Sequence, residues 1–154
     1  MTPAYLHLIN DGERMDYLHL LLMADESEEA VRNYIVEGDL YAIHFEDVLA
    51  GVILFISVND STVELKNLAV IPEFRGRGIG KASIKEGLVI YKNQGKDRVI
   101  VGTANSSIDN IAFYQKAGFR MYEIKRNFFF NYPEPIFEYG IRAMDMIMFE
   151  KTLM

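Results

Sequence analysis

The sequence predicts an α+β fold of about seven strands and four helices, and three observations support this prediction. Short apolar runs separated by turn residues are typical of strands, and they alternate with stretches that have apolar residues at helical spacing. Glycine follows the helical stretches at Gly38, Gly95 and Gly118, where a left-handed residue commonly ends a helix. The 154 residues are 50% hydrophobic and include no cysteine. We therefore expect residues 1–154 to form one domain whose core needs no disulfide.

The first half of the chain predicts one strand, two helices and a meander. Residues 4–10 form the strand, and "NDGE" at 10–13 resembles a capping box that opens a helix through about Met23. Ser27 is a suitable cap for a second helix, which ends at Gly38. Residues 40–70 contain three β-rich runs broken by Glu46-Asp47 and by Asn59-Asp60-Ser61. This pattern is typical of an antiparallel meander.

The second half predicts two helices and three strands. A helix runs from Gly78 to Gly95, and "RVIVGTA" at 98–104 is typical of a buried strand. A short helix follows over residues 107–117. Two further strands, 119–129 and 142–152, flank the loop "NYPEPIFEYG" at 131–140.

Composition excludes several classes of function. The net charge of −6 argues against general nucleic-acid binding and favours cationic partners. The three histidines, His7, His19 and His44, lack the spacing of metal ligands, so we expect no metal site. There is no signal-peptide pattern and no apolar run long enough to span a membrane. We expect a soluble, cytoplasmic protein with no membrane partner.

A glycine-rich loop is the most informative stretch of the sequence. Three glycines and three cations lie between Arg75 and Lys81, after an apolar strand and before a helix. Free backbone N–H groups at a helix start, with the helix dipole behind them, bind anions such as phosphate. The loop does not match a P-loop, because three residues separate Gly76 from Gly80, and it does not match the dinucleotide fingerprint. The alternative interpretation is a solvated basic loop.

Two motifs and the element order resemble the GNAT superfamily of acyl-CoA N-acyltransferases. "LAVIPEFRGRGIGKASI" at 68–84 is similar to the pyrophosphate motif of that superfamily, and "NIAFYQKAGF" at 110–119 is similar to the helix and Gly-Phe corner that follow it. The resemblance is most specific over residues 65–119. It implies a three-layer α/β arrangement with a mixed, mostly antiparallel sheet and helices on both faces. It also implies acetyl-CoA as the cosubstrate.

The resemblance assigns coenzyme contacts to the loop and to the strand before it. The loop residues it implicates are Arg75, Gly76, Arg77, Gly78, Gly80 and Lys81. On the strand, Leu68 and Val70 would bind the pantetheine arm through their main chain, and the N–H of Leu68 would point at the thioester oxygen. The alternative for this strand is ordinary sheet pairing.

The chain departs from the superfamily at the start of the second motif. Superfamily members often have Asn at the N-cap of this helix, where this chain has Ser107, with Asn105 and Asn110 nearby. Ser107 is a suitable helix cap. We keep all three residues as candidate coenzyme contacts.

The resemblance implies two catalytic candidates, Tyr114 and Glu64. Tyr114 lies where the superfamily carries a Tyr near the coenzyme sulfur, and a phenol keeps its proton at neutral pH and can donate it to a departing thiolate. The alternative for Tyr114 is a buried aromatic stripe. Glu64 lies where some members place the carboxylate that deprotonates the amine. Alternation would instead put Glu64 and Lys66 on a solvated strand face.

These observations predict an acetyl-CoA-dependent N-acetyltransferase. A primary amine of a small molecule, such as a polyamine, an amino sugar or an amino acid, would attack the thioester directly, since no Cys is available for a covalent enzyme intermediate. Peptide N-termini or lysines are an alternative acceptor, which would require an open groove between the early helices and the loop at 131–140. A noncatalytic acyl-CoA-binding sensor is an alternative function. The sequence does not decide between a monomer and a homodimer.

Overall fold

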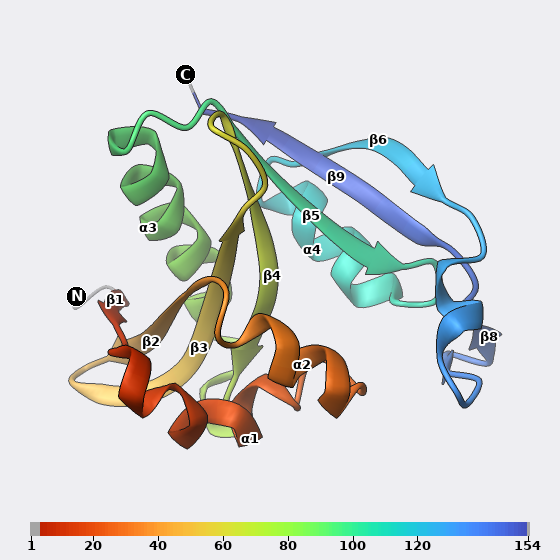
Figure 1. Ribbon diagram of the computed structural model, residues 1–154, viewed down its shortest axis with the longest axis horizontal. Helices are drawn as coiled ribbons and strands as arrows, with labels where there is room; N and C mark the ends of the chain where they lie inside the picture. Colours follow the sequence, from red (N-terminus) through yellow and green to blue (C-terminus); the bar gives the residue numbers. More distant parts are fainter. Residues whose placement is uncertain (1–3, 154) are drawn as a thin grey trace.

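The computed structural model describes residues 4–153 and is built around a seven-stranded sheet (Figure 1). The order of the strands in space is β1-β2-β3-β4-β5-β9-β6. Their bounds are β1 Tyr5–Leu8, β2 Asp39–Phe45, β3 Val48–Ser57, β4 Thr62–Val70, β5 Arg98–Ala104, β6 Arg120–Lys125 and β9 Met146–Thr152. Only β4 and β5 pair in parallel, and the other neighbours are antiparallel. The expected mixed, mostly antiparallel sheet is confirmed.

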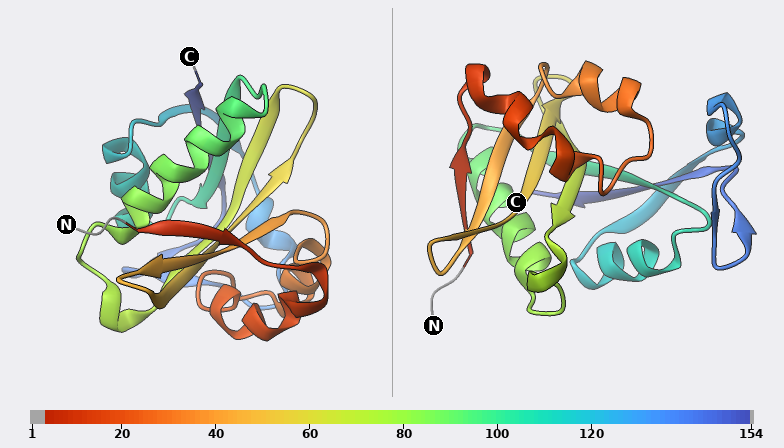
Figure 2. Two further views of the ribbon diagram at one scale, coloured as in Figure 1. Left: turned by 90° about the vertical axis from the view of Figure 1, so that its left-hand side faces the viewer. Right: turned by 90° about the horizontal axis from the view of Figure 1, so that it is seen from below.

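Helices cover both faces of the sheet, as Figure 2 shows. One face carries α1 (Leu18–Leu21) and α2 (Glu28–Tyr34), and the other carries α3 (Ile79–Asn93) and α4 (Ile108–Lys116). Each face has its own apolar core. The α1–α2 side includes Leu21, Val31 and Ile35, whereas the α3–α4 side includes Phe55, Ile84 and Phe149. The expected three layers are therefore confirmed.

The meander forms as the sequence predicts. The turn between β2 and β3 consists of Glu46 and Asp47, whose φ angles are 53° and 63°. Two successive residues with positive φ give a turn whose twist matches that of the flanking strands. Asn59 closes the next turn, because its Oδ1 accepts hydrogen bonds from the backbone N–H groups of Ser61 and Thr62.

The two parallel strands separate part-way along their length. Pairing between β4 and β5 is limited to Thr62–Leu65 against Arg98–Val101. Beyond Leu65 the two strands diverge toward their carboxyl ends (Figure 1). The sheet is therefore split in its middle, and the two halves are joined only at one end of these strands.

The predicted helix over residues 10–23 is wrong in two respects. Residues Asp11–Tyr17 form a 3₁₀ helix (η1), and only Leu18–Leu21 are α-helical. Asn10 precedes η1, but its side chain caps no backbone N–H, so the capping box is absent.

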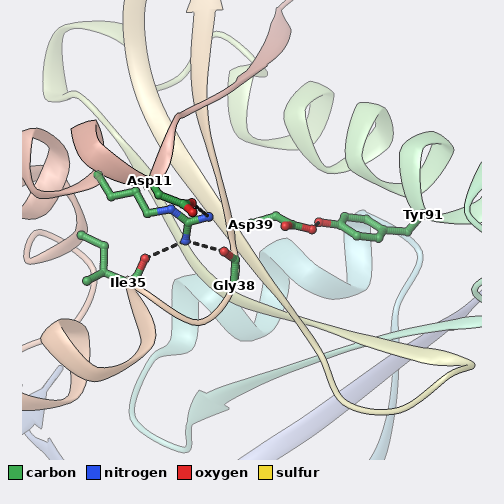
Figure 3. Close-up of polar contacts among 6 residues, drawn as sticks. Asp11, Ile35, Gly38, Asp39 and Tyr91 are labelled. Atoms are coloured by element: carbon green, nitrogen blue, oxygen red, sulfur yellow. Dashed lines mark hydrogen bonds and ion pairs between the residues drawn. The ribbon is translucent and has the colours of Figure 1, made fainter.

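Arg14 holds this irregular segment against the chain that follows α2. Its buried guanidinium donates hydrogen bonds to the carbonyl oxygens of Ile35, at 2.8 Å, and Gly38, and it forms an ion pair with Asp11 (Figure 3). These carbonyls lie at the end of α2, where helices leave C=O groups without internal partners. Arg14 thus joins η1 to the end of α2.

The second half follows the predicted order, with changes near the late loop. The helix and strand predicted over 78–95 and 98–104 are confirmed. The strand predicted to reach residue 129 ends at Lys125, and the last strand begins at Met146 rather than residue 142. Between them lie a 3₁₀ helix η3 (Phe128–Asn131) and a small hairpin of β7 (Phe137–Glu138) and β8 (Ile141–Arg142).

Asn105 fixes the return of this segment to the sheet. Its Oδ1 accepts hydrogen bonds from the backbone N–H groups of Met144, at 2.8 Å, and Asp145, at 3.0 Å. Its Nδ2 donates to the carbonyl of Arg142 at 3.1 Å. Within residues 4–153, no helix is long and apolar enough to cross a membrane.

Candidate active site

A cleft of about 710 Å³ opens where β4 and β5 separate. It is lined by residues from both sides of the sheet, such as Tyr34 of α2 on one side and Phe113 and Tyr114 of α4 on the other. Both separated strand segments line it as well. The cleft therefore passes through the sheet at its split.

The glycine-rich loop leads from the end of β4 into α3. Gly76 and Gly78 have φ angles of 79° and 77°, a conformation that L side chains rarely adopt. A Cβ at either position would meet no other atom within 4 Å, so the space beside this backbone is open. Gly80 differs, because a Cβ there would lie 3.3 Å from Phe113, so its small size lets α3 approach α4.

The three cations of the loop have different surroundings. Arg75 lines the cleft and donates from Nε to the carbonyl of Val70 at 2.9 Å. Arg77 lies over the ring of Phe74, 5.5 Å from its centroid. Lys81 is exposed on the first turn of α3. All three place positive charge around the amino terminus of a 15-residue helix.

The carboxyl half of β4 has one edge that β5 does not pair. The N–H of Ile71 donates to the carbonyl of Ala50 at 2.7 Å, so the main chain of Ile71 faces β3. Alternation along the strand directs the main-chain groups of Leu68 and Val70 the other way, into the split. Both residues line the cleft.

Tyr114 reaches the cleft from α4 through an aromatic cluster. Its ring packs against Phe113, Phe119 and Phe149, with centroid distances of 5.2, 5.9 and 6.0 Å. The residue is 8% exposed and lines the cleft. Burial raises the pKa of the Tyr114 hydroxyl to about 12. Among residues 4–153 this hydroxyl has no hydrogen-bond partner, so it is a protonated donor available to a molecule in the cleft.

Glu64 lies on β4 in the cleft, on the face of the sheet that α2 covers. Its Oε2 is 3.9 Å from Nζ of Lys66, which lies over the ring of Tyr34. The side chain of Glu64 is only 24% exposed. It therefore belongs to the wall of the cleft rather than to an open strand face.

A β-bulge next to Glu64 brings in a residue that the sequence analysis did not identify. The β3–β4 register shifts at this point, so that Asn67 pairs with Leu54 and Leu65 pairs with Phe55. Asn67 is 5% exposed, lines the cleft and donates from Nδ2 to the hydroxyl of Tyr34 at 2.8 Å. No local pattern predicts this contact, because it joins residues 33 positions apart.

The segment between α1 and α2, together with the first turn of α2, forms an acidic wall that the sequence did not reveal. Asp25, Glu26 and Glu29 all line the cleft. Asp25 is held in place, since it accepts hydrogen bonds from the N–H of Ser27 and the hydroxyl of Tyr34, both at 3.0 Å. The available signal was the acidic stretch "DESEE" at 25–29, which the analysis used only to locate a helix start.

The polar residues at the start of α4 are used differently from the prediction. Ser107 is the N-cap residue, but its hydroxyl caps no backbone N–H and instead donates to Glu138 at 2.6 Å. The helix-cap prediction for Ser107 is therefore wrong, because a carboxylate from the late hairpin takes its hydrogen bond. Asn110 lines the cleft, with its Nδ2 3.4 Å from Thr103. Asn105 holds residues 142–145, as described above, and does not line the cleft.

A sheet split between two parallel strands, with a glycine loop and a helix start at the carboxyl end of one of them, defines the fold of acyl-CoA-dependent acetyltransferases. The model of the Acetyltransferase (GNAT) family matches residues 7–119. The chain therefore belongs to the GNAT family of acetyltransferases.

Relatives and solved structures agree with this assignment. The chain is 40% identical over 129 residues to the uncharacterized N-acetyltransferase YvbK of Bacillus subtilis (strain 168). The aligned residues cover 83% of each protein. A GNAT family acetyltransferase from Elizabethkingia anophelis, solved with acetyl-CoA bound, superposes with a TM-score of 0.91 at 37% identity, covering 98% of this chain and 99% of that one. An acetyltransferase from Bacillus subtilis in complex with CoA gives a TM-score of 0.86 at 35% identity over all of both chains. The protein is an N-acetyltransferase that uses acetyl-CoA as its cosubstrate.

Proposed function

We propose that the enzyme transfers the acetyl group of acetyl-CoA to a primary amine of a small molecule by direct attack of that amine. The observation that carries this proposal is the position of Glu64 and Tyr114. They come from a central strand and from a helix on one face of the sheet, and both line the cleft at its split. A proton acceptor and a proton donor are thus available in one cavity.

The loop between β4 and α3 is the proposed site for the coenzyme pyrophosphate. The backbone N–H groups of Arg77, Gly78 and Gly80 lie at the start of α3, and open space surrounds Gly76 and Gly78. The side chains of Arg75 and Lys81 add positive charge for phosphate oxygens. Leu68 and Val70 offer main-chain groups to the pantetheine arm along the unpaired edge of β4.

One of the three predicted polar contacts is assigned differently in this proposal. Ser107 and Asn110 remain candidates at the rim of the coenzyme side, since both line the cleft. Asn105 receives a structural role, because its amide holds the chain after β8.

Tyr114 is the proposed proton donor. When bound, acetyl-CoA supplies an activated thioester, and the departing sulfur needs a proton to leave as a neutral thiol. The pKa of about 12 keeps the phenol protonated at neutral pH. Its freedom from other hydrogen bonds among the described residues leaves the proton available.

Glu64 is the proposed proton acceptor. An alkylammonium group cannot attack a carbonyl carbon, so one proton must leave the amine before or during attack. The Glu64 carboxylate lines the cleft on the α2 side, and it can take that proton directly or through one water molecule.

The size of the cleft supports a small acceptor. A volume of about 710 Å³ lies within the range of roughly 300–1,000 Å³ that is typical of small-molecule sites. The coenzyme arm occupies part of this volume, which leaves room for a compact amine. A peptide would have to lie outside the cleft and insert one residue.

A thiol-release assay with acetyl-CoA tests the function. The assay compares a panel of small primary amines with lysine-containing peptides and with peptides that have free N-termini. Thiol release that depends on a small amine, with the acetylated amine identified by mass spectrometry, would support the proposal. Faster reaction with peptides would favour the peptide alternative. Coenzyme binding without release on any amine would favour a noncatalytic sensor.

A further inference from the structure

We propose that the acceptor is a small aliphatic diamine or polyamine, whose second ammonium group binds between the acidic wall and the late loop. This inference rests on the proposed function, since it concerns the acceptor end of the same cleft. It goes further by specifying a second positive charge that is remote from the reacting nitrogen.

The charge of the cleft is strongly unbalanced. Five carboxylates line it, namely Asp25, Glu26, Glu29, Glu64 and Glu138, against the two cations Lys66 and Arg75. Arg75 belongs to the coenzyme loop, and Lys66 lies 3.9 Å from Glu64. The carboxylates of the α1–α2 segment therefore face the cleft without a matching positive charge from the described lining residues.

Two of these carboxylates are available to a ligand. Asp25 is occupied by Ser27 and Tyr34. Glu26 and Glu29 are exposed and form no hydrogen bond or ion pair among residues 4–153. Glu28, between them in sequence, points elsewhere, since it pairs with Arg32 at 2.7 Å and does not line the cleft. Within "DESEE", only Glu26 and Glu29 therefore both line the cleft and lack a partner among the described residues.

A buried acceptor atom provides an independent sign of a hydrogen-bond donor in the ligand. Asn67 lines the cleft and is 5% exposed, and its Nδ2 is held by the carbonyl of Leu21 and the hydroxyl of Tyr34. Its Oδ1 has no partner among the described residues. A buried acceptor without a donor is costly, and an N–H from a ligand would satisfy it.

Aromatic rings complete the opposite wall. Phe128, Phe129 and Tyr132 of the late loop line the cleft, and the rings of Phe129 and Tyr132 lie 5.3 Å apart. Tyr132 lines the same cleft as Asp25 and Glu26, and burial together with the charges of these two carboxylates raises the pKa of its hydroxyl. Carboxylates and aromatic faces together attract an alkylammonium group and its methylene chain.

The reaction leaves this second charge intact. The reacting ammonium loses one proton before it forms the C–N bond with the acetyl carbon, and a second when the C–S bond breaks. One proton is gained by the sulfur of coenzyme A, and the other is released. The product is an amide at one end and an ammonium at the other. The distal group therefore contributes binding in the ground state and the transition state alike, which lowers KM without raising kcat.

The experiment compares 1,4-diaminobutane with pentylamine, in which a methyl group replaces the second amine. The diamine is expected to have a kcat/KM about tenfold higher or more, carried by KM, as for a charge-assisted hydrogen bond. This preference should shrink as salt is added, because the Debye length falls to about 3 Å at 1 M. Glu26→Gln and Glu29→Gln should each reduce the preference severalfold, and Glu28→Gln serves as the matched control.

The outcomes separate this inference from the function on which it rests. A diamine preference that depends on Glu26 or Glu29 and not on Glu28 supports it. Equal kcat/KM values for the two amines, or equal effects of the three variants, overturn it while leaving the small-amine function standing. Preference for a lysine peptide over every diamine also overturns it. Failure of every amine, with coenzyme A still raising Tm, rejects the inference and the proposed function together.

Discussion

The amide nitrogen of Asn67 on β4 donates to the hydroxyl of Tyr34 on α2 at 2.8 Å, and that hydroxyl in turn donates to Asp25 at 3.0 Å. This chain of hydrogen bonds joins a central strand, a helix and the segment before it. It fixes the acidic wall relative to the strand that carries Glu64. The geometry of the acceptor side thus depends on a phenol that need not take part in the chemistry.

Replacing Tyr34 with Phe should therefore affect the acceptor more than the coenzyme. The variant removes the donor to Asp25 and one of the two acceptors of the Asn67 amide, which should cost about 1–2 kcal/mol of stability. Acceptor KM should rise, and acetyl-CoA KM should stay near the wild-type value. Steady-state kinetics with both substrates checks this. Tyr17→Phe is the control, since the Tyr17 hydroxyl makes no hydrogen bond among the described residues.

Gly78 and Gly95 allow the coenzyme loop to be tested with a matched pair. Both have positive φ angles, of 77° and 88°, and a Cβ at either would meet no atom within 4 Å. Substitution by Ala should cost about 1–2 kcal/mol at each site through backbone strain alone. Only Gly78 lies within the proposed coenzyme loop, so only Gly78→Ala should also weaken coenzyme A binding.

The measurement for this pair is the coenzyme-dependent shift in Tm. At a hundredfold excess over Kd, coenzyme A should stabilise the wild type by about 2.7 kcal/mol. Gly95→Ala should keep this gain, and Gly78→Ala should lose most of it. An equal gain in the two variants would mean that the phosphate does not bind at this loop.

Tyr114→Phe should separate catalysis from stability. Loss of the proton donor should lower turnover roughly 10²-fold or more. Stability should change little, because the hydroxyl forms no hydrogen bond within residues 4–153. Tyr91→Phe should instead lower stability and leave turnover nearly unchanged. Tyr91 donates to Asp39 at 2.7 Å (Figure 3) and does not line the cleft. Similar turnover losses in the two variants would return Tyr114 to a purely structural role.

The same variant predicts a difference at alkaline pH. The folded-state pKa of Tyr114, about 12, lies above the ordinary phenol value of 10.0. The stability that the neutral phenol contributes is therefore complete below pH 10 and is lost as the pH rises toward 12. Between these values the wild type should lose stability faster than Tyr114→Phe. Denaturant unfolding curves at several pH values measure this difference.

Glu64→Gln tests the proton acceptor through the pH dependence of turnover. An acceptor amine with a pKa near 10.4 is almost wholly protonated at pH 7, so an enzyme without a base gains rate as the pH rises. The variant should be slow at neutral pH and should recover partly at alkaline pH, with acetyl-CoA affinity unchanged. A pH profile of turnover for Glu64→Gln that superimposes on the wild-type profile would exclude Glu64 as the proton acceptor. Glu138→Gln should be measured in parallel, because Glu138 also lines the cleft.

The conformation of the proposed coenzyme loop was predictable because its signals are local. The loop from Arg75 to Lys81 has its conformation encoded in its glycines, and the helix that follows begins and ends at Gly78 and Gly95 as expected. The position of Tyr114 was likewise carried by a contiguous motif.

The geometry of the proposed acceptor side was not predictable because it depends on contacts between distant residues. The bulge that places Asn67 beside Tyr34 requires a register shift against β3, which alternation along β4 does not reveal. The segment after Asn10 also depends on distant contacts, because Arg14 donates hydrogen bonds to the carbonyls of Ile35 and Gly38. Ser107 was assigned to its own helix, but Glu138, 31 residues away, accepts its hydrogen bond.

The strand order has a consequence for the newly synthesised chain. β6 is made before β9 but pairs with no other strand of the main sheet, and β9 lies between it and β5. Until β9 emerges from the ribosome, β6 has no partner, and its side chains of Met121 and Ile124 are 49% and 61% exposed even after folding. Vectorial synthesis thus delivers the meander first and leaves the second half of the sheet open. The strand β9 also contributes Met146 to the lining of the cleft, so the wall of the cleft is complete only after β9 has been made.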